Sequence, residues 1–549
     1  MSPKESKPQL SADAIRTDKV RIEIARKELS NGLVTSKLIH SDAEPVLGHA
    51  PQVERVLASF IHFSDIHICD TQSPARLEFL DRLADPDHPM QPVVKYIGTY
   101  RPQEFLSVQV AEAMVAAANA IEVGPLAGAP IDAVIVTGDV TDNAQHNELT
   151  WYKTVLDGGP LQPSSGNLDH KFYGPSSTDP EFYDDHYYHP DTATSGMIED
   201  RPKAIFGVPA FDGLLEASRQ PFIAAGLNHP WFGIHGNHDA LLQGTAVPNE
   251  WVRDLVVGDQ KLDHLSLSAN LQDFFGNFGE VGPATYGDPS AIDTRPIEAD
   301  PRRRFSTIDD WVQMHTGCGH DHGLDERRPL QAYFSRDVGD QVRLVALDTV
   351  NEHGGWQGCI AREQFEWLER LLEFSVDKYI VLASHHPLQD LFNGWAPEGV
   401  AAPALRDEVE ALLAKHPNVV LWAAGHVHDN HVEPALAPNG DVAFWQVRAA
   451  SLIDWPQQGR TIEIVRATDC RIAIGTVVFD HAGPLDFDSD AGWLSSPVNM
   501  AGASRLIAAN DWQRQAGDPG FDEWTGTVAD RNRWLWLADP FADPFTDLP

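Results

Sequence analysis

The sequence predicts an α/β fold, a two-sheet mixed β-sandwich flanked by helices and interrupted by long insertions. Three observations support this prediction. Short apolar runs of strand length alternate with amphipathic stretches of helical length between residues 60 and 422. A β-rich stretch follows at about 443–479 and indicates a second sheet. Polar residues gather where several apolar runs end, which is where open α/β sheets place their sites.

Continuous apolar runs mark the predicted strands. The run from Ala133 to Val136 is apolar at every position, which indicates burial on both faces. Comparable runs predict strands at residues 60–64, 133–137, 231–235, 342–347, 379–383 and 419–422, with further β-rich segments at about 443–449, 461–466 and 471–479.

Helical spacing marks the elements between the strands. In the stretch 362–374, Phe365, Leu368, Leu371 and Leu372 fall on one stripe, as in a helix with one buried face. Similar patterns predict helices at residues 102–123, 145–156 and 404–415.

The chain divides by pattern into three parts. A core domain is predicted at residues 55–480, after an N-terminal extension at 1–54 and before a C-terminal extension at 481–549. Two stretches of the core, at about 159–229 and 240–330, are long, weakly periodic and rich in Pro, Gly and Asp. Loops of this length are usually functional, so we expect them to fold over the site. The C-terminal extension is expected to be a docked helix followed by an irregular tail.

The charge balance excludes some partners. Lys and Arg number 41 against 80 Asp and Glu, a net charge of −39. Long nucleic acids and anionic membranes need a cationic surface, so neither is expected as a partner. The sequence has no apolar run of the roughly 18 residues that a membrane span needs, and its start lacks the pattern of a signal peptide. Four cysteines without a CxxC pair favour a reducing compartment, so we expect a cytoplasmic protein.

Five short polar blocks supply side chains of the metal-ligand type. Each follows an apolar run. They are Asp65-Ile66-His67, Gly138-Asp139-Val140-Thr141-Asp142-Asn143, Gly236-Asn237-His238-Asp239, Ser384-His385-His386-Pro387 and Gly425-His426-Val427-His428.

The residue types indicate the chemistry. Residues i and i+2 of a strand point the same way, so Asp65 and His67 can reach one cation. The carboxylate of Asp139 can bridge two cations, and Asn237 offers an amide oxygen. Histidine ligands suit Mn, Fe, Zn or Co more than Ca. Two divalent cations outweigh the carboxylates of Asp65 and Asp139, so the cluster would attract an anion and acidify water. A phosphate ester meets both conditions.

The five blocks, in this order, resemble the calcineurin-like metallophosphoesterase superfamily, with the pattern D-x-H, G-D-x-x-D, G-N-H-[DE], H-x-P and G-H-x-H. The resemblance covers about residues 55–450 outside the two insertions. It implies two divalent metal ions and a metal-bridging hydroxide that attacks phosphorus. One ion would be held by Asp65, His67, Asp139 and His428, and the other by Asp139, Asn237, His385 and His426.

The resemblance also implies catalytic and substrate-binding roles. His238 would bind phosphate and protonate the leaving group, and Asp239 would orient it. Arg76 and Asn143 are the candidate substrate residues. Asp142 stands where purple acid phosphatases carry a tyrosine, which argues against a ferric-tyrosinate centre. The segment from Asp65 to Arg76 is similar to a group of large bacterial, largely actinobacterial, metallophosphoesterases.

The predicted function is therefore phosphoester hydrolysis, with small phosphodiesters favoured. A phosphomonoesterase acting on a small phosphorylated metabolite is the alternative, because a dianionic monoester needs extra cationic contacts that Arg76 or an insertion residue could supply. A metal-binding scaffold without catalysis is the alternative of another class, and a nuclease acting on long chains is disfavoured by the net charge.

Overall fold

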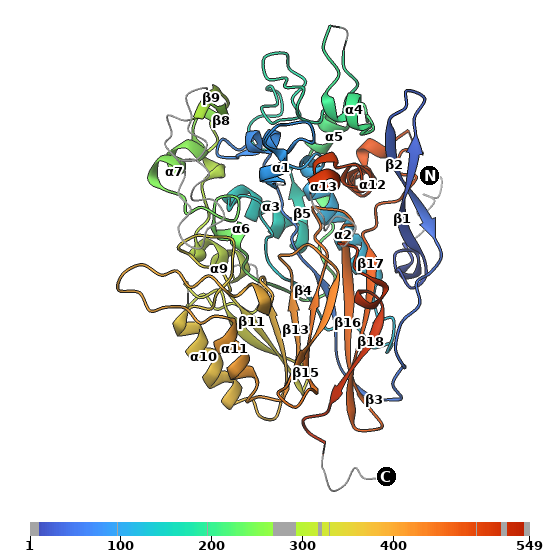
Figure 1. Ribbon diagram of the computed structural model, residues 1–549, viewed down its shortest axis with the longest axis vertical. Helices are drawn as coiled ribbons and strands as arrows, with labels where there is room; N and C mark the ends of the chain where they lie inside the picture. The colour runs from blue at the N-terminus through green and yellow to red at the C-terminus, as the bar shows by residue number, and fades with distance from the viewer. Residues whose placement is uncertain are drawn as a thin grey trace, which may run out of the picture.

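The computed structural model contains two six-stranded sheets in the part of the chain that it describes, residues 10–542 without 96, 195, 267–291, 317–320, 329, 490 and 518–523 (Figure 1). The first sheet has the order β18 (Arg533–Ala538), β17 (Arg471–Asp480), β16 (Gln458–Ala467), β3 (Val53–Phe63), β4 (Ala133–Val136) and β7 (Trp231–Gly233). The second has the order β10 (Phe334–Val338), β11 (Val342–Leu347), β12 (Tyr379–Ser384), β13 (Val419–Ala424), β15 (Val442–Arg448) and β14 (His431–Leu436).

Both sheets are mixed, as the sequence predicts. In the first, β3, β4 and β7 run parallel, and β16, β17 and β18 join them antiparallel. In the second, β11, β12, β13 and β15 run parallel between two antiparallel edge strands. The carboxyl ends of the parallel strands of each sheet therefore lie at one edge, where the polar blocks follow them.

The core lies between the sheets because successive residues of each strand face opposite sides. On β12, Val381 and Ala383 join the main core with residues of the first sheet, whereas Ile380 and Leu382 face the helices outside. Those helices are α10 (Arg362–Glu373) and α11 (Arg406–Leu413), which cover the outer face of the second sheet (Figure 1). The first sheet is covered by α2 (Ser107–Ala120), which packs against α3 (His146–Asp157) and α12 (Pro497–Ala508).

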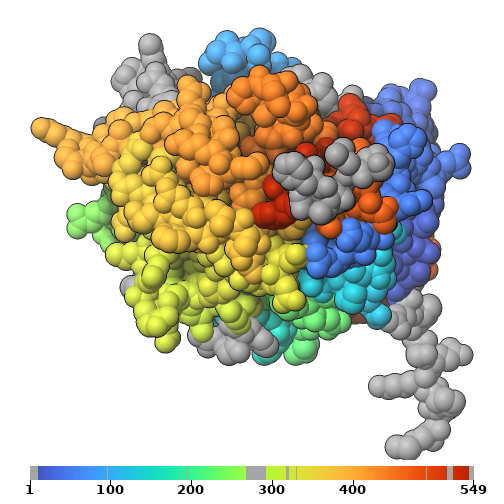
Figure 2. Space-filling view, turned by 90° about the horizontal axis from the view of Figure 1, so that it is seen from below, coloured from blue at the N-terminus to red at the C-terminus, as the bar shows by residue number. Residues whose placement is uncertain are grey.

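The remaining elements are short. The N-terminal extension forms the hairpin of β1 (Arg21–Glu28) and β2 (Val34–Ser41). Figure 2 shows this end of the chain in blue on the opposite side of the molecule from the second sheet and its helices, in gold. The predicted insertions contain the pairs β5 (Gly159–Leu161) with β6 (Phe222–Ala224) and β8 (Gln260–Leu265) with β9 (Ile292–Pro296), and the helices α4 (Arg201–Phe206), α5 (Leu214–Ser218), α7 (Glu250–Val257) and α9 (Ile308–Thr316). The short helix α6 (Asn237–Ala240) lies between the two insertions.

The predicted strands and helices are present, with one correction in the C-terminal extension. The docked helix is α12, followed by α13 (Trp512–Gly517), but residues 533–538 are not irregular. They form β18 and pair with β17, because Trp534 and Trp536 pack in a small cluster on one face while Leu535 and Leu537 join the main core on the other. The division at residues 54 and 480 stays a prediction.

None of the described helices has the length and hydropathy of a membrane span.

Candidate metal centre

The candidate ligands come from five loops at the carboxyl ends of parallel strands. Asp65 and His67 follow β3, Asp139 follows β4, and Asn237 begins α6 just after β7. From the second sheet, His385 follows β12 directly, while His426 and His428 follow β13. The structure thus brings all seven predicted ligand residues to the junction of the two sheets.

The backbone at these residues differs from the expected strand geometry. Asp65, His67, Asp139, His426 and His428 all have positive φ, between 47° and 71°. The idea that residues i and i+2 share a strand face is therefore wrong here, because both pairs lie in loops beyond their strands. Left-handed backbone is costly for residues with a side chain and is typically kept at functional sites. Gly138, with φ of 88°, permits close packing, since a Cβ there would lie 2.6 Å from His385 Nδ1.

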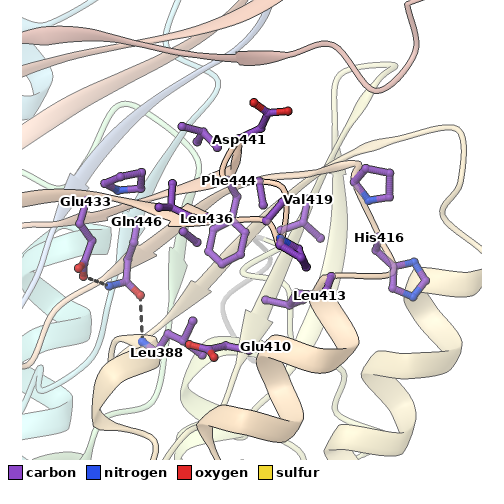
Figure 3. A pocket seen from close by; sticks show the side chains of 18 of the residues that line it. Leu388, Glu410, Leu413, His416, Val419, Glu433, Leu436, Asp441, Phe444 and Gln446 are labelled. Carbon is purple, nitrogen blue, oxygen red and sulfur yellow. Dashed lines mark hydrogen bonds between the residues drawn. The ribbon is translucent and has the colours of Figure 1, made fainter.

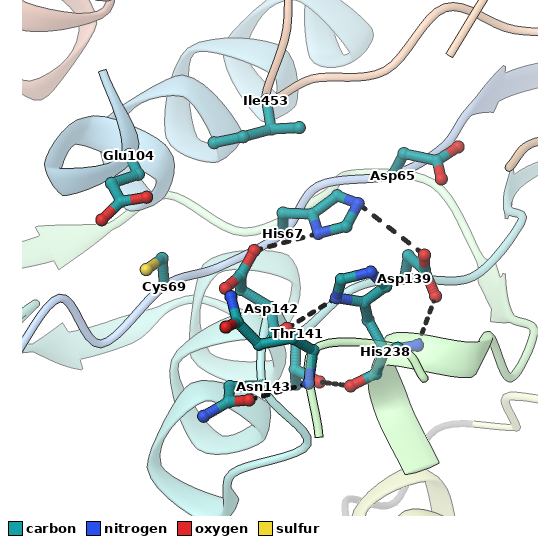
Figure 4. A network of polar contacts seen from close by, with 12 residues as sticks. Asp65, His67, Cys69, Glu104, Asp139, Thr141, Asp142, Asn143, His238 and Ile453 are labelled. Atoms are coloured by element: carbon teal, nitrogen blue, oxygen red, sulfur yellow. Dashed lines mark hydrogen bonds and ion pairs between the residues drawn. The ribbon is translucent and has the colours of Figure 1, made fainter. Parts of the chain in front are cut away.

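The first half of the site consists of Asp65, His67 and His428. Their ligand-type atoms lie within 4.8 Å of one another, and His428 Nε2 is 3.3 Å from Asp65 Oδ1. Each histidine gives its Nδ1–H to a buried carboxylate: His67 to Asp142 at 3.2 Å and His428 to Asp454 at 2.6 Å. These bonds fix the tautomers so that Nε2 faces the centre, and Figure 4 shows the contact of His67 with Asp142.

Buried arginines hold the two supporting carboxylates. Arg101 lies between them, with Nε 2.8 Å from Asp454 Oδ1 and Nη1 3.8 Å from Asp142 Oδ1. Arg76 donates to Asp142, and Arg514 of the C-terminal extension lies 3.0 Å from Asp454. The sequence analysis missed Asp454 and Arg101. Asp454 stands a few residues beyond the parallel strand β15, at the same sheet edge as the ligands, and that position is the signal that could have indicated it.

Arg76 and Asn143, the two predicted substrate residues, are both buried. The side chain of Arg76 is fully buried and paired with Asp142 and, at 2.7 Å, with Glu104. It cannot contact a phosphate without breaking its ion pairs with both carboxylates. The structure therefore assigns Arg76 to holding Asp142 in place and not to binding substrate. Asn143 is also buried, and its Oδ1 accepts a hydrogen bond from the Gln243 N–H at 2.9 Å. A substrate role for Asn143 stays a prediction.

The second half of the site consists of Asn237, His385 and His426. His426 Nδ1 and His385 Nε2 lie 3.2 Å apart, so they can face one cation. The supporting partners are backbone carbonyls: His385 Nδ1 donates to the Thr137 oxygen at 2.8 Å, and Asn237 Nδ2 donates to the Gly244 oxygen at 2.9 Å.

Asp139 lies between the two halves. Its Oδ2 is 3.2 Å from His385 Nε2 and 3.7 Å from His67 Nε2, one ligand-type nitrogen from each half. Burial favours a protonated carboxyl, but His385, His238 and His67 hold the pKa of Asp139 well below its usual range. The carboxylate is thus ionised and placed where it can face both halves.

These residues fit bound divalent cations. Two ligand-type atoms, His67 Nε2 and Asn237 Oδ1, are buried without a hydrogen-bond partner among the described residues. An unpaired buried polar group costs about 1–3 kcal/mol, which a cation at the same place would offset. Burial lowers the pKa of His428, but Asp65 and Asp454 outweigh this effect and raise that pKa to about 10.

His238 and Asp239 differ in their relation to the centre. His238 is half-buried, its backbone N–H donates to Asp139, and its Nδ1 lies 2.6 Å from the carbonyl oxygen of Asp142 (Figure 4). That carbonyl fixes the Nδ1–H tautomer, so Nε2 is the nitrogen without the hydrogen in the neutral ring. The prediction that Asp239 orients His238 is wrong, because its carboxylate instead accepts hydrogen bonds from Thr141 and from the Gly236 N–H at 2.9 Å. Asp239 holds the loop in place.

A groove of about 530 Å³ near the second sheet is a different feature (Figure 3). It lies between α11 and the strands β14 and β15, and none of the candidate ligands lines it. Glu410, Glu433 and Asp441 at its walls would repel an anionic ester. The candidate site for an anion is therefore the cluster of histidines, not this groove.

Comparison with known proteins agrees with this assignment. Residues 210–430 match the model of the calcineurin-like phosphoesterase family. The 3′,5′-cyclic adenosine monophosphate phosphodiesterases CpdA of two Escherichia coli strains are 30% identical over 91 residues, which are 17% of this chain and 32% of theirs. The chain thus spans about a third of the length of these curated relatives. A dimetal phosphatase from Danio rerio matches with a TM-score of 0.31 and 11% identity, over 78% of this chain and 100% of that one.

Residues 210–430 are therefore similar to the calcineurin-like phosphoesterase family, and the candidate ligand cluster fits that similarity.

Proposed function

We propose that the protein is a hydrolase of phosphate esters that works with two divalent metal ions. The observation that carries the proposal is the gathering of seven candidate ligand residues, Asp139 among them, at one sheet junction, with two buried ligand-type atoms without a hydrogen-bond partner among the described residues. Asp65, His67, Asp139 and His428 would hold one ion, and Asp139, Asn237, His385 and His426 the other. Such ions act as Lewis acids on the phosphate and make water acidic enough to attack it at neutral pH.

His238 supplies the acid in this proposal. The Asp142 carbonyl accepts the hydrogen on Nδ1, so Nε2 is the nitrogen that gains and gives a proton. The backbone of His238 is bonded to Asp139, which keeps the ring beside the centre. Protonation of the leaving oxygen by a positioned histidine contributes typically about 10²–10⁴-fold to the rate.

Small diesters are favoured over monoesters. A dianionic monoester needs additional cations, and Arg76 and Arg101 are both buried in ion pairs with carboxylates. A diester carries one charge less and fits a site whose positive charge comes from the metal ions alone. The CpdA relatives are phosphodiesterases of a cyclic diester, 3′,5′-cyclic adenosine monophosphate, and this similarity supports the same preference.

The test compares leaving groups. His238→Ala should lower turnover of an alkyl diester such as 3′,5′-cyclic AMP by about 10²–10⁴-fold. It should lower turnover of bis(p-nitrophenyl) phosphate less, because a nitrophenolate leaves without being protonated. The metal content of His238→Ala should equal that of wild type. The control is His264→Ala, because the His264 side chain on strand β8 is half exposed. Equal rates for His238→Ala and wild type on both substrates would exclude the acid role.

Two further results separate the alternatives. Wild type with added Mn²⁺ should hydrolyse bis(p-nitrophenyl) phosphate faster than p-nitrophenyl phosphate, and the reverse order would favour a phosphomonoesterase. No hydrolysis of either ester with Mn, Fe, Zn or Co would favour the scaffold.

A further inference from the structure

Two exposed aromatic side chains stand beside the second half of the metal centre. The Trp356 ring stacks on the ring of His426, with centroids 5.8 Å apart and planes 20° apart. Phe392 meets Trp356 edge-on at 5.9 Å. Trp356 remains 38% exposed and Phe392 43% exposed, so the pair presents an apolar surface next to a candidate ligand.

The loop that carries Trp356 is fixed from several sides. His386 Nε2 lies 2.9 Å from the Trp356 carbonyl oxygen, and since a carbonyl can only accept, Nε2 carries the hydrogen. Gly355 N–H donates to the Thr245 oxygen at 2.8 Å, and Asn393 Nδ2 donates to the Gly354 oxygen at 2.9 Å. His386 follows the ligand His385, and Asn393 follows Phe392. The aromatic pair is therefore held in place relative to the ligands before anything binds.

This position distinguishes the pair from other exposed apolar side chains. Single exposed hydrophobic residues are common and need no explanation, and Phe374, 81% exposed at the end of α10, is one of them. Trp356 and Phe392 contact each other and come from two different loops, and Trp356 also stacks on the candidate ligand His426. Arg76 and Arg101 are buried in ion pairs and do not offer a substrate a cationic surface. The aromatic pair offers it an apolar surface instead.

We propose that Trp356 and Phe392 form a platform on which a flat aromatic group of the substrate, such as a nucleobase, stacks while its phosphate lies at the metal centre. The inference rests on the proposed function and names the substrate class: small phosphoesters with a planar ring close to the phosphate. Stacking of a base on an aromatic side chain changes affinity by roughly 5- to 150-fold.

Binding of AMP and of ribose 5-phosphate to the Mn²⁺-loaded full chain, measured by calorimetry, tests the platform through affinity and not through turnover. The two probes share the phosphate and the sugar and differ in the ring. Wild type should bind AMP more tightly, and Trp356→Ala should remove most of this difference, roughly 5- to 150-fold, while ribose 5-phosphate binding changes less than about twofold. Trp356→Phe should keep most of the preference, Phe392→Ala should reduce it, and Phe374→Ala should leave it unchanged.

Equal affinity of wild type for both probes, or binding of neither, would overturn the platform, as would an equal loss of both in Trp356→Ala. The Trp356→Phe variant and the melting temperature of Trp356→Ala show whether a loss of binding in the alanine variant comes from a folding defect. The assay also separates the two proposals. A preference for AMP in a protein that hydrolyses no ester supports the platform and contradicts the hydrolase, whereas hydrolysis without the preference does the opposite.

Discussion

The two halves of the metal centre are supported in different ways. In the first half, His67 and His428 each donate to a carboxylate, Asp142 and Asp454, which lie in a buried network with arginines. In the second half, His385 donates to a backbone carbonyl, that of Thr137, and the Asn237 side chain does the same toward Gly244. Charged side chains support one half, and the course of the main chain supports the other.

This difference has consequences for affinity and for robustness. A carboxylate behind a ligating histidine raises its basicity and adds negative charge near the cation, so the first half should bind a divalent ion more tightly. Its network, however, joins residues as distant as Arg101, Asp454 and Arg514, and losing one leaves another buried charge unpaired. In the second half, His385 is supported by the Thr137 carbonyl, which a side-chain substitution does not remove.

The largest effect is expected from Asp454→Asn. The amide oxygen can still accept from His428 Nδ1, but the substitution removes the negative charge and turns an N–H group toward Arg101. Loss of such a partner typically weakens a metal site by about 10- to 100-fold. A titration with Co²⁺, followed by its visible absorption, should show the tighter of two binding steps weakened by that factor and the other step nearly unchanged.

The matched control is Asp480→Asn, which changes another buried carboxyl, hydrogen-bonded to Gln458 and away from the ligands. It should leave both binding steps as in wild type. An Asp454→Asn protein in which both steps weaken equally would contradict the division into halves.

A smaller effect is expected from Asp239→Asn, which acts on the second half through the backbone. Asp239 accepts hydrogen bonds from the N–H groups of Thr141 and Gly236 on its two oxygens, and an amide can satisfy only one of them. The free energy of unfolding should fall by about 1–3 kcal/mol in urea denaturation. The binding step of the second half should weaken, because Gly236 and Asp239 flank the ligand Asn237.

Asp377→Asn, at an exposed position after α10, is the control for this substitution and should change neither quantity. Since Asp239 does not contact His238, hydrolysis by metal-saturated Asp239→Asn should stay well above that of His238→Ala. Equal losses in the two variants would restore the orienting role that the geometry denies.

The sequence predicts the ligand blocks better than their supports, for a physical reason. The ligands lie in short segments at strand ends, so local pattern and order are enough to find Asp65 or His385. The supports are long-range: Asp454 is 26 residues from His428 and 353 from Arg101, and only the sheet order brings them together. The wrong role for Asp239 has the same origin, because its neighbour in sequence, His238, is oriented by the Asp142 carbonyl, 96 residues away.

Strand prediction failed where the run was short and lay outside the α/β alternation. Residues 533–538 form β18 because β17 offers an unpaired edge, and an isolated alternating run does not reveal that edge. Positive φ at Asp65 and His67 was equally hidden, since Asp and His adopt left-handed backbone more often than most residues but still in a small minority of cases.

The smallest effect concerns the carboxylates behind the first half and depends on pH. Asp511 is buried and caps α13, accepting from the N–H groups of Gln513 and Arg514. Burial, helped by the negative charges of Asp454 and Asp81, raises the pKa of Asp511 to about 7. In the unfolded chain the pKa is about 3.9. The folded state therefore keeps its proton longer, and its stability relative to a variant that cannot ionise falls as pH rises from about 4 to about 7.

Asp511→Asn keeps an oxygen for both N–H groups but cannot ionise. Its unfolding free energy, measured in urea at pH 5, 6, 7 and 8, should rise relative to wild type by at most about 1.4 kcal/mol per pH unit and level off above pH 7. Metal affinity of the first half should stay unchanged, because Arg514 still reaches Asp454. If the unfolding free energies of the two proteins change with pH in the same way, the pKa of Asp511 is not raised in the folded state. A loss of metal affinity would show instead that the first half depends on the charge of Asp511 as well as on that of Asp454.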